Sequence, residues 1–300
     1  MIEVKDLSKN YDEIQAIDHI SVSINEGNIF GLIGTNGAGK STLLKTICGI
    51  LKPANGEVLI DGENVYESES AKQKIFYISD DQYYFANANA NDMRSFYEAV
   101  YCDFDRQKFN ELIQKFNLDA DRKINTFSKG MKKQLAVILG VCANTKYLLC
   151  DETFDGLDPV MRQAVKSIFI GEMTDRKMTP IIASHNLREL EDTCDHIGVL
   201  HKGGILLSKD LEEMKLSLHK IQCVFNNEEA KDKFISLTNP IKIEQRGSLY
   251  LLTIRGEKLD IENKIKETEM IFSELLSLSL EEIFISETEV VGYDIKSLIL

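Results

Sequence analysis

The chain has 300 residues, of which 43% are apolar and 28% are charged, proportions that exclude a disordered chain and a fibrous repeat. Its formal net charge of -13 argues against a nucleic-acid partner, because binding to phosphate backbones depends on clustered lysine and arginine. The length allows one large α/β domain and a small second one.

The sequence shows neither a secretion signal nor a membrane span. The six cysteines are scattered, without a C-x-x-C pair or metal-ligand spacing, so we expect reduced and mostly buried thiols. The N-terminus lacks the apolar segment of a signal peptide, and the longest strongly apolar run, residues 135–143, is far shorter than the roughly 18–20 residues that cross a bilayer. We therefore expect a cytoplasmic chain, with a different chain in the membrane if a membrane is involved.

The first elements predict an antiparallel β start that leads into a phosphate-binding loop. Residues 2–4 and 20–24 alternate apolar and polar side chains as half-buried strands do, and residues 9–12 are turn-like. An apolar run at 29–33 then enters a glycine-rich loop, and helical spacing resumes over 41–50.

The loop at residues 34–41, Gly-Thr-Asn-Gly-Ala-Gly-Lys-Ser, fits the pattern G-x-x-x-x-G-K-[ST]. Its glycines let backbone N–H groups wrap phosphate oxygens, and the following helix offers its positive N-terminus. Lys40 is predicted to reach the β- and γ-phosphates and the Ser41 hydroxyl to ligate Mg²⁺. An ordinary glycine-rich turn is the alternative, which the strand before and the helix after argue against. The predicted nucleotide-binding residues here are Gly34, Asn36, Gly37, Ala38, Gly39, Lys40, Ser41 and Thr42.

A polar middle region, from about 63 to 123, contains helical patterns around 93–101 and 106–116, and we interpret it as part of a helical insertion covering about 80–145. A helix near 132–143, a strand at 147–150, a helix at 160–173 and a strand at 180–184 follow. Strands separated by helices imply a mostly parallel, covered sheet.

The strand at 147–150 ends in two carboxylates, Asp151 and Glu152. Chain order delivers both acids to the carboxyl edge of the sheet, where ligands bind. Asp151 would hold the Mg²⁺ shell, and Glu152 would orient or deprotonate a water that attacks the γ-phosphate. Taken alone, the pattern also fits a strand that meets a solvated turn. Together with the phosphate loop it predicts a nucleoside triphosphatase.

After about residue 208 the units become short. We expect a strand at 219–225, a helix at 228–237, a hairpin that turns at 246–247, a helix at 258–268, a strand at 270–277 and a helix at 280–287. This β-α-β-β-α-β order is ferredoxin-like. We therefore expect an ATPase domain over 1–208 and a small α+β domain over 215–300, joined by a charged linker near 209–218.

Residues 127–131, Phe-Ser-Lys-Gly-Met, resemble the Leu-Ser-Gly-Gly-Gln signature of ATP-binding cassette (ABC) ATPases. Ser128 and Gly130 fall in register with it, and Lys129 adds a positive charge. A Ser-x-Gly at a helix start offers a hydroxyl and free N–H groups to an anion, which suits a γ-phosphate bound by a second subunit. A plain capped helix is the alternative reading of this segment alone.

Further segments extend this resemblance over residues 1–208. Residues 155–159 resemble the family's D-loop, which includes Asp158 and lines the interface between two ATP sites. Ser184-His185 ends a strand as the family's switch histidine does, which implies that His185 senses or holds the γ-phosphate. Tyr11 corresponds to the aromatic residue that stacks on adenine.

The sequence also departs from the family pattern. Asp80 stands where the family has the glutamine of its Q-loop, and Gln82 comes two positions late. A carboxylate can still ligate Mg²⁺, although it cannot donate a hydrogen bond as an amide can. Thr153-Phe154 also stands where Pro-Thr is common.

The resemblance implies an α/β fold, in which the P-loop ABC ATPase core has an antiparallel β subdomain and a helical subdomain. It implies an ATP- and Mg²⁺-dependent ATPase that works as a head-to-tail homodimer with a separate transmembrane permease.

The Ser-Lys-Gly-Met variant, the small C-terminal domain and its end at 280–284 resemble exporters of peptides or antibiotics. A soluble ABC ATPase that remodels or scaffolds other proteins is the alternative; a DNA-repair or ribosome-acting member would need coiled coils or a second cassette. For the C-terminal domain we expect a structural or dimer-stabilising role, with small-molecule sensing as the alternative.

Overall fold

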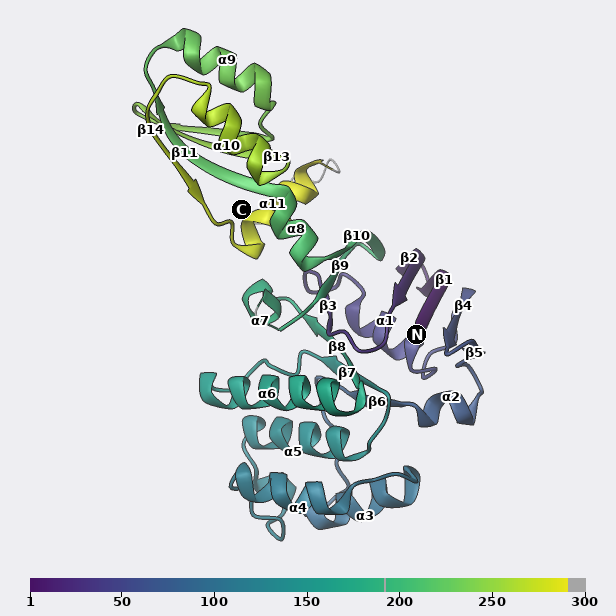
Figure 1. The fold of residues 1–300 in the computed structure, drawn as a ribbon. Coiled ribbons are helices and arrows are strands. Elements are labelled where there is room, and N and C mark those ends of the chain that lie inside the picture. Colours follow the sequence, from purple (N-terminus) through teal and green to yellow (C-terminus); the bar gives the residue numbers. More distant parts are fainter. Residues whose placement is uncertain (192, 291–300) are drawn as a thin grey trace. The chain divides into compact units, whose positions relative to one another are not determined.

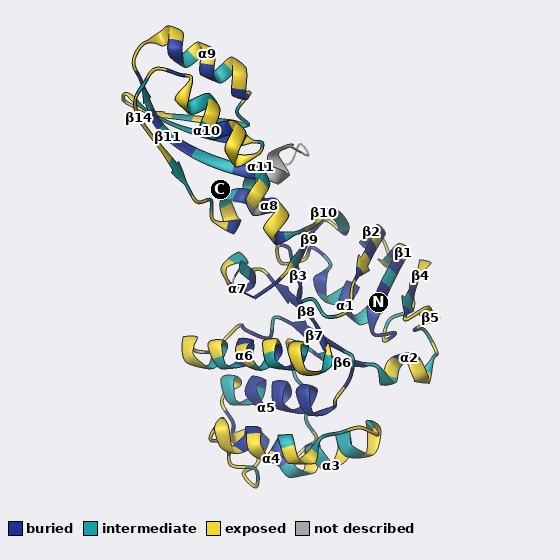
Figure 2. Ribbon diagram, viewed as in Figure 1, coloured by how far each residue is buried: buried dark blue, intermediate teal, exposed yellow. Residues whose placement is uncertain are grey.

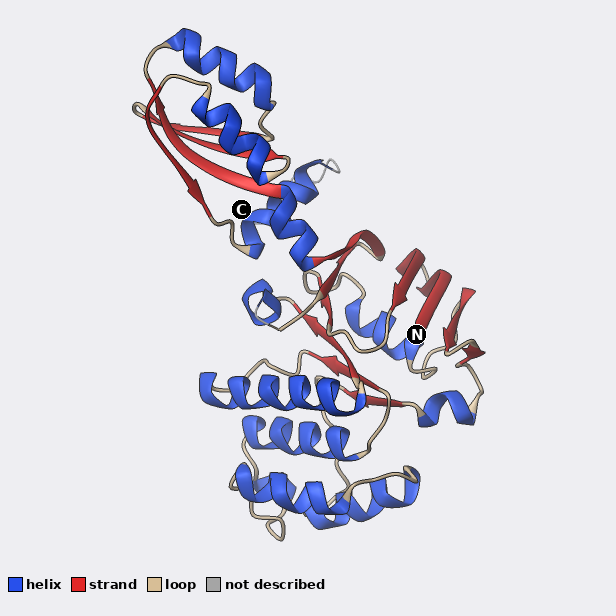
Figure 3. Cartoon of the chain, in the orientation of Figure 1, coloured by secondary structure: helices blue, strands red, loops and turns tan. Residues whose placement is uncertain are grey.

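A computed structural model describes residues 1–191 and 193–290 of the chain. The chain forms two compact units, Met1–Ser208 and Lys209–Leu300. Figure 1 labels the elements of both units, and Figure 3 distinguishes their helices and strands.

The first unit begins with an antiparallel sheet in the order β2-β1-β4-β5. These strands are β1 Ile2–Tyr11, β2 Ile14–Ile24, β4 Asn55–Ile60 and β5 Glu63–Asn64. The expected turn at 9–12 is wrong, because the strand continues to Tyr11, which pairs with Ile14. Irregular register between Val4 and Asn10 breaks the alternation of side chains, and this hides the strand in the sequence.

A six-stranded sheet in the order β10-β9-β3-β8-β7-β6 forms the centre of the unit. Its strands are β3 Phe30–Ile33, β6 Ile75–Ile78, β7 Tyr147–Asp151, β8 Thr179–Ser184, β9 His196–His201 and β10 Gly204–Asp210. The pairings of β3 with β8 and β9, and of β7 with β6 and β8, are parallel. All residues of β3, β7 and β8 are buried, as Figure 2 shows in dark blue, which is expected for a sheet covered on both faces. The loops after these parallel strands therefore meet at one edge.

Four helices in the described part of this unit accompany the sheets: α1 Lys40–Ile47, α2 Glu69–Gln73, α6 Pro159–Arg176 and α7 Leu187–Glu191. A helical arm contains α3 Ala90–Val100, α4 Arg106–Lys115, the 3-10 turn Ile124–Thr126 and α5 Lys129–Cys142. The predicted helices at 93–101 and 106–116 are confirmed within a few residues. Helix α5 begins three residues earlier than predicted, because the Ser128 side chain caps it by accepting from the Met131 N–H at 3.2 Å.

The second unit contains α8 Leu211–Ser217, β11 Leu218–Phe225, α9 Glu228–Thr238, β12 Lys242–Arg246, β13 Leu249–Arg255, α10 Lys258–Lys266, β14 Met270–Leu276 and α11 Leu280–Val290. Its sheet has the order β12-β13-β11-β14 with antiparallel neighbours, as in a split β-α-β fold. Ile221, Phe234 and Leu252 are fully buried in its core. The predicted linker near 209–218 is largely helix α8, because the Asp210 carboxylate caps it.

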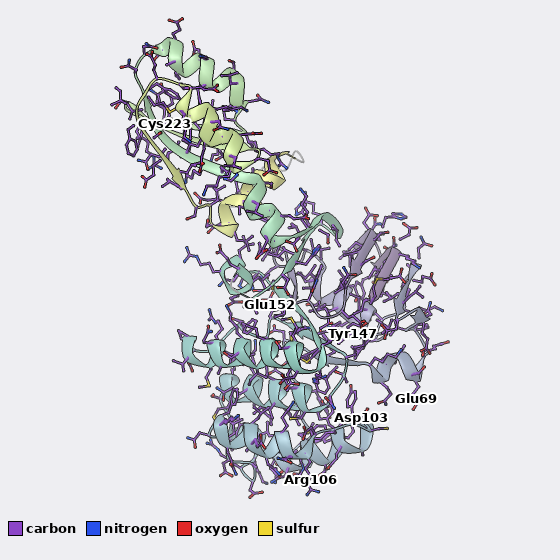
Figure 4. All side chains as sticks on the ribbon, in the orientation of Figure 1. Glu69, Asp103, Arg106, Tyr147, Glu152 and Cys223 are labelled. Atoms are coloured by element: carbon purple, nitrogen blue, oxygen red, sulfur yellow. The ribbon has the colours of Figure 1, made fainter. Side chains whose placement is uncertain are left out.

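All six cysteines are free; Cys102, just after α3, is exposed and the others are buried. Figure 4 labels Cys223, one of the buried thiols, on β11. Among the described residues, no helix combines the length and apolar character that crossing a membrane requires.

Candidate active site

The phosphate loop connects β3 to α1 in a conformation that only glycine adopts easily. Gly37 and Gly39 have φ values of 80° and 106°. A Cβ atom on Gly39 would lie 2.5 Å from the Ala16 carbonyl oxygen on β2, so glycine lets the loop approach this strand. Lys40, buried at 6% exposure, donates from Nζ to the Gly34 carbonyl oxygen at 2.7 Å. The loop therefore folds around its own lysine.

A cavity of about 560 Å³ lies over this loop. Its lining brings together predicted site residues from β1, the phosphate loop, the segment after β6 and the end of β7: Tyr11, Asn36, Gly37, Gly39, Lys40, Ser41, Thr42, Asp80 and Glu152. The Tyr11 side chain is 44% exposed at this cavity, where a ring could stack on a base. Residues far apart in the sequence thus share one pocket.

Asp151 is the last residue of β7, and Glu152 follows it directly; Figure 4 labels Glu152 and Tyr147, the first residue of this strand. Asp151 is buried, and its Oδ2 accepts a hydrogen bond from the Tyr77 hydroxyl at 2.9 Å. Burial raises the pKa of the Asp151 carboxyl, against the opposing effect of the hydroxyl groups of Ser41 and Tyr77. Its Oδ1 is buried without a hydrogen-bond partner among the described residues. This oxygen is chemically suited to a hard cation such as Mg²⁺, and the Ser41 hydroxyl lies close to the same carboxyl group.

The Glu152 carboxylate contacts side chains from two other segments of the site. Its Oε1 lies 3.2 Å from Lys40 Nζ, and its Oε2 lies 2.9 Å from His185 Nδ1. The backbone of Glu152 has a φ of 48°, in the left-handed region that few residues other than glycine occupy. Such strain is frequent at functional sites, where surrounding contacts hold it in place. The geometry gives one carboxylate contact with both predicted phosphate-binding side chains.

Asp80 follows β6 and pairs with Lys133 of α5, with 3.2 Å between Oδ1 and Nζ. Gln82, the late glutamine, donates from its amide to the carbonyl oxygens of Ser79 and Asp80 in its own loop, at 2.9 and 3.0 Å. Its side chain is therefore engaged locally.

The signature and D-loop residues do not line this cavity. Ser128, Lys129 and Gly130 lie at the start of α5, and a Cβ atom on Gly130 would lie 3.5 Å from the carbonyl oxygen of Gly156 in the D-loop segment. The Asp158 carboxylate caps α6 by accepting from the N–H groups of Val160 and Met161. Within one chain these segments neighbour each other but are not part of the cavity lining. Gly34 and Ala38 belong to the loop but do not line the cavity; their carbonyl oxygens accept from Lys40 Nζ and from the Gly203 N–H.

Sequence reasoning missed several residues of the site. Ile14, Gln15, Ala16, Thr35, Lys202 and Gly203 also line the cavity. The β9–β10 turn is joined to the loop, since the Gly203 N–H donates to the Ala38 carbonyl oxygen at 3.1 Å. The Lys202-Gly203-Gly204 turn was a local signal of a hairpin, but its distance from the loop in sequence gave no sign of this contact.

A parallel sheet with a phosphate loop after β3 and two adjacent carboxylates after β7 defines a P-loop nucleoside triphosphatase. Comparison with known proteins specifies the class further. The family model for ABC transporters matches residues 17–155. The ABC transporter ATP-binding protein YtrB of Bacillus subtilis (strain 168) is 31% identical over 287 residues, which cover 96% of this chain and 98% of that protein.

The bacitracin transport ATP-binding protein BcrA of Bacillus licheniformis is 28% identical over 218 residues, covering 72% of this chain and 71% of that protein. A solved ATP-binding subunit of an ABC transporter matches with a TM-score of 0.67 at 25% identity, over 72% of this chain and 92% of that one. A dimeric cassette bound to ADP and phosphate shares the fold, with a TM-score of 0.63 at 21% identity over 70% of this chain and 99% of that one.

The chain belongs to the family of ABC transporter ATP-binding proteins. It is an ATP-binding and ATP-hydrolysing subunit, and its fold is that of the family's cassettes, as the sequence predicted. The relatives are named as transport proteins, which favours transport over the alternative of a soluble scaffold.

Proposed function

We propose that two copies of this chain clasp two ATP molecules head to tail, and that hydrolysis at Glu152 reopens the pair and drives a transmembrane permease that exports peptides or antibiotics. The contact of the Glu152 carboxylate with Lys40 and His185 at the mouth of the phosphate loop carries this proposal. The three side chains meet where a γ-phosphate would lie if the loop wraps the phosphates of ATP.

In the proposed reaction, the protein mainly positions groups and stabilises charge, because phosphoryl transfer offers little covalent chemistry to an enzyme. Lys40 and the N–H groups of the loop hold the β- and γ-phosphates. Glu152 accepts or orients a proton of the attacking water, and His185 Nδ1 fixes the carboxylate in that orientation. Tyr11, which lines the same cavity, stacks on the base.

Mg²⁺ fits the oxygen donors on this chain. When bound, it neutralises charge that develops on the transferred phosphate. The Ser41 hydroxyl and the unpartnered Oδ1 of buried Asp151 are the groups we propose to hold it, with the Asp80 carboxylate as a further predicted donor. The Tyr77 hydroxyl fixes the other oxygen of Asp151.

We infer the dimer because the signature residues do not line the nucleotide cavity of their own chain. Ser128, Lys129 and Gly130 present a helix N-terminus outside the cavity, so they are available to the nucleotide of a second copy. In a head-to-tail pair, each cavity is completed by the partner's signature, and Asp158 lies near the shared boundary. The dimeric cassette with bound ADP and phosphate supports this arrangement.

The permease is proposed to dock on the segment from about 80 to 100, which places the chain at the cytoplasmic face of the membrane. Tyr83, Phe85 and Phe96 form an exposed aromatic cluster there, with ring centroids 6.1 Å apart for Tyr83–Phe85 and 4.9 Å apart for Phe85–Phe96. Contiguous exposed aromatics are typical of binding surfaces. The bacitracin transporter subunit among the relatives supports an antibiotic or peptide cargo. The C-terminal unit, proposed as a domain over 215–300, is assigned a structural or dimer-stabilising role.

Replacement of Glu152 by glutamine tests the proposal. Glutamine keeps the shape of the side chain but cannot act as the base, so kcat should fall by about 10²–10⁴-fold. ATP should still bind, and light scattering should show that dimers accumulate. Glu111→Gln, on the exposed side of α4, is the control and should keep wild-type turnover. Unchanged turnover in Glu152→Gln would remove Glu152 from its role, and a monomer at saturating ATP would refute the dimer.

A further inference from the structure

Lys133 is a buried lysine with two partners from different strand ends. It lies in the second turn of α5, two residues after the signature segment 127–131, and is 6% exposed. Its Nζ donates to the Glu152 carbonyl oxygen at 2.6 Å and to Asp80 Oδ1 at 3.2 Å. A buried ammonium group is costly unless it is paired and hydrogen-bonded, so these two bonds determine where it can lie.

The first bond acts on the peptide that aims the catalytic carboxylate. Glu152 has the left-handed φ of 48°, a conformation that persists only where its surroundings hold it. The Glu152 N–H donates to the Ala183 carbonyl oxygen at 3.0 Å, and the Glu152 carbonyl oxygen accepts from the Asp155 N–H at 3.2 Å as well as from Lys133. Of these bonds, the one from Lys133 is charge-assisted and comes from the helical arm.

The second bond ties the segment after β6 to the same helix. The Asp80 side chain is 59% exposed and lines the nucleotide cavity, while its oxygen pairs with Lys133. Nearby, the Tyr84 hydroxyl donates to the Lys132 carbonyl oxygen at 2.6 Å, which is a second tie between the same segment and the start of α5. The start of α5, the segment 80–84 and the Glu152 peptide are therefore linked through one ammonium group.

We propose that Lys133 is a positioning residue for ATP hydrolysis. It couples the position of helix α5 to the orientation of the Glu152 carboxylate, and Asp80 is the counter-charge that orients the Lys133 ammonium group. The proposal rests on the role assigned to Glu152 above. A displacement of α5 moves Nζ, Nζ moves the Glu152 peptide, and the carboxylate then leaves its alignment with Lys40 and His185. Lys133 thus affects the chemical step more than nucleotide affinity, because its hydrogen bonds within the described residues go to the Glu152 carbonyl oxygen and to Asp80 rather than to the phosphate loop.

The full-length chain with Lys133→Met tests this. We expect kcat to fall by about 10–100-fold, as misplacement of a catalytic group by about 1 Å can cost 10²-fold, while the calorimetric Kd for ADP changes by less than about threefold. Lys133→Arg, which keeps two donors, should recover at least part of kcat. Lys132→Met is the matched control, because Lys132 is only partly buried and its hydrogen bond with Tyr84 uses the backbone carbonyl oxygen, which the substitution keeps; it should retain wild-type kcat. Thermal unfolding of each variant reports that it is folded.

Asp80→Asn is the second variant, at a side chain that is 59% exposed, and thermal unfolding again reports whether it is folded. Asparagine keeps an oxygen that can ligate Mg²⁺ but removes the charge that pairs with Lys133. The variant should therefore lower kcat in the wild-type background and change it no further in the Lys133→Met background. Independent losses that multiply would overturn the role of Asp80 as orienting partner. Wild-type kcat in Lys133→Met, an equal loss in Lys132→Met, or a loss of ADP affinity as large as the loss of kcat would overturn the proposal for Lys133. If Glu152→Gln itself kept turnover, the proposed function would fail first, so the two failures are distinguishable.

Discussion

Gly39→Ala tests whether the phosphate loop owes its shape to close approach of backbone to backbone. The Cβ would lie 2.5 Å from the Ala16 carbonyl oxygen, and real contacts of this kind are essentially never under 3.0 Å, so the loop and β2 must separate by at least 0.5 Å. The φ of 106° adds conformational strain for any residue with a side chain. Strain of about 1–3 kcal/mol and overpacking of about 1–3 kcal/mol together predict a loss of roughly 3 kcal/mol in the free energy of unfolding.

Gly37→Ala is the matched control for this prediction. Gly37 also has a positive φ, 80°, but a Cβ there would meet no atom within 4 Å. Its loss of stability should therefore be only the conformational cost, about 1 kcal/mol. Urea unfolding followed by circular dichroism, without nucleotide, measures both variants at equal protein concentration. Equal stabilities for the two variants would refute the reasoning, because the contact with Ala16 would then contribute nothing.

Two further predictions concern charge. Lys40→Ala should weaken ATP binding in calorimetry by about 10–150-fold, since hydrogen bonds to charged groups contribute about 1.5–3 kcal/mol; an unchanged Kd would contradict the phosphate-binding role. Asp61 accepts hydrogen bonds from the N-terminal ammonium group, Lys146 and Tyr147; burial alone would raise the pKa of its carboxyl, but these donors outweigh burial and hold that pKa well below its ordinary value near 4. The ionised Asp61 carboxylate therefore stabilises the fold above about pH 4, and this stabilisation is lost as the pH falls further. The free energy of unfolding should then fall less steeply with decreasing pH in Asp61→Asn than in the wild type. Identical pH dependence in the two proteins would exclude the network.

Much of the fold was predictable because its signals are local. The α4 helix begins where Asp105 caps it, and β7 is a continuous apolar run that ends in carboxylates. The long hairpin of β1 and β2 was not predictable in full, because register irregularities between Val4 and Asn10 disturb the alternation on which strand prediction depends. Helix α8 was not predictable, because its charged sequence resembles a solvated linker.

Some residues of the candidate site also have local sequence signals, whereas others depend on tertiary packing. The phosphate loop, Asp151, Glu152 and His185 were predicted because their residue types and order carry the chemistry. Lys133 could not be predicted as a site residue, because a lysine in a basic stretch after the signature is typical of a solvated surface. Its burial and its contact with Glu152 depend on how α5 packs beside β7, which is a tertiary relation between segments 19 residues apart in sequence.

The distribution of thiols makes this protein convenient for spectroscopy. Burial raises the pKa of Cys150 to about 12 and that of Cys223 to about 11, so neither forms a reactive thiolate near neutral pH. Cys102 alone is exposed, just beyond the end of α3 in the helical arm. A maleimide fluorophore should therefore attach at this one position in the natural sequence, and energy transfer between labelled copies would follow the helical arms through each turnover.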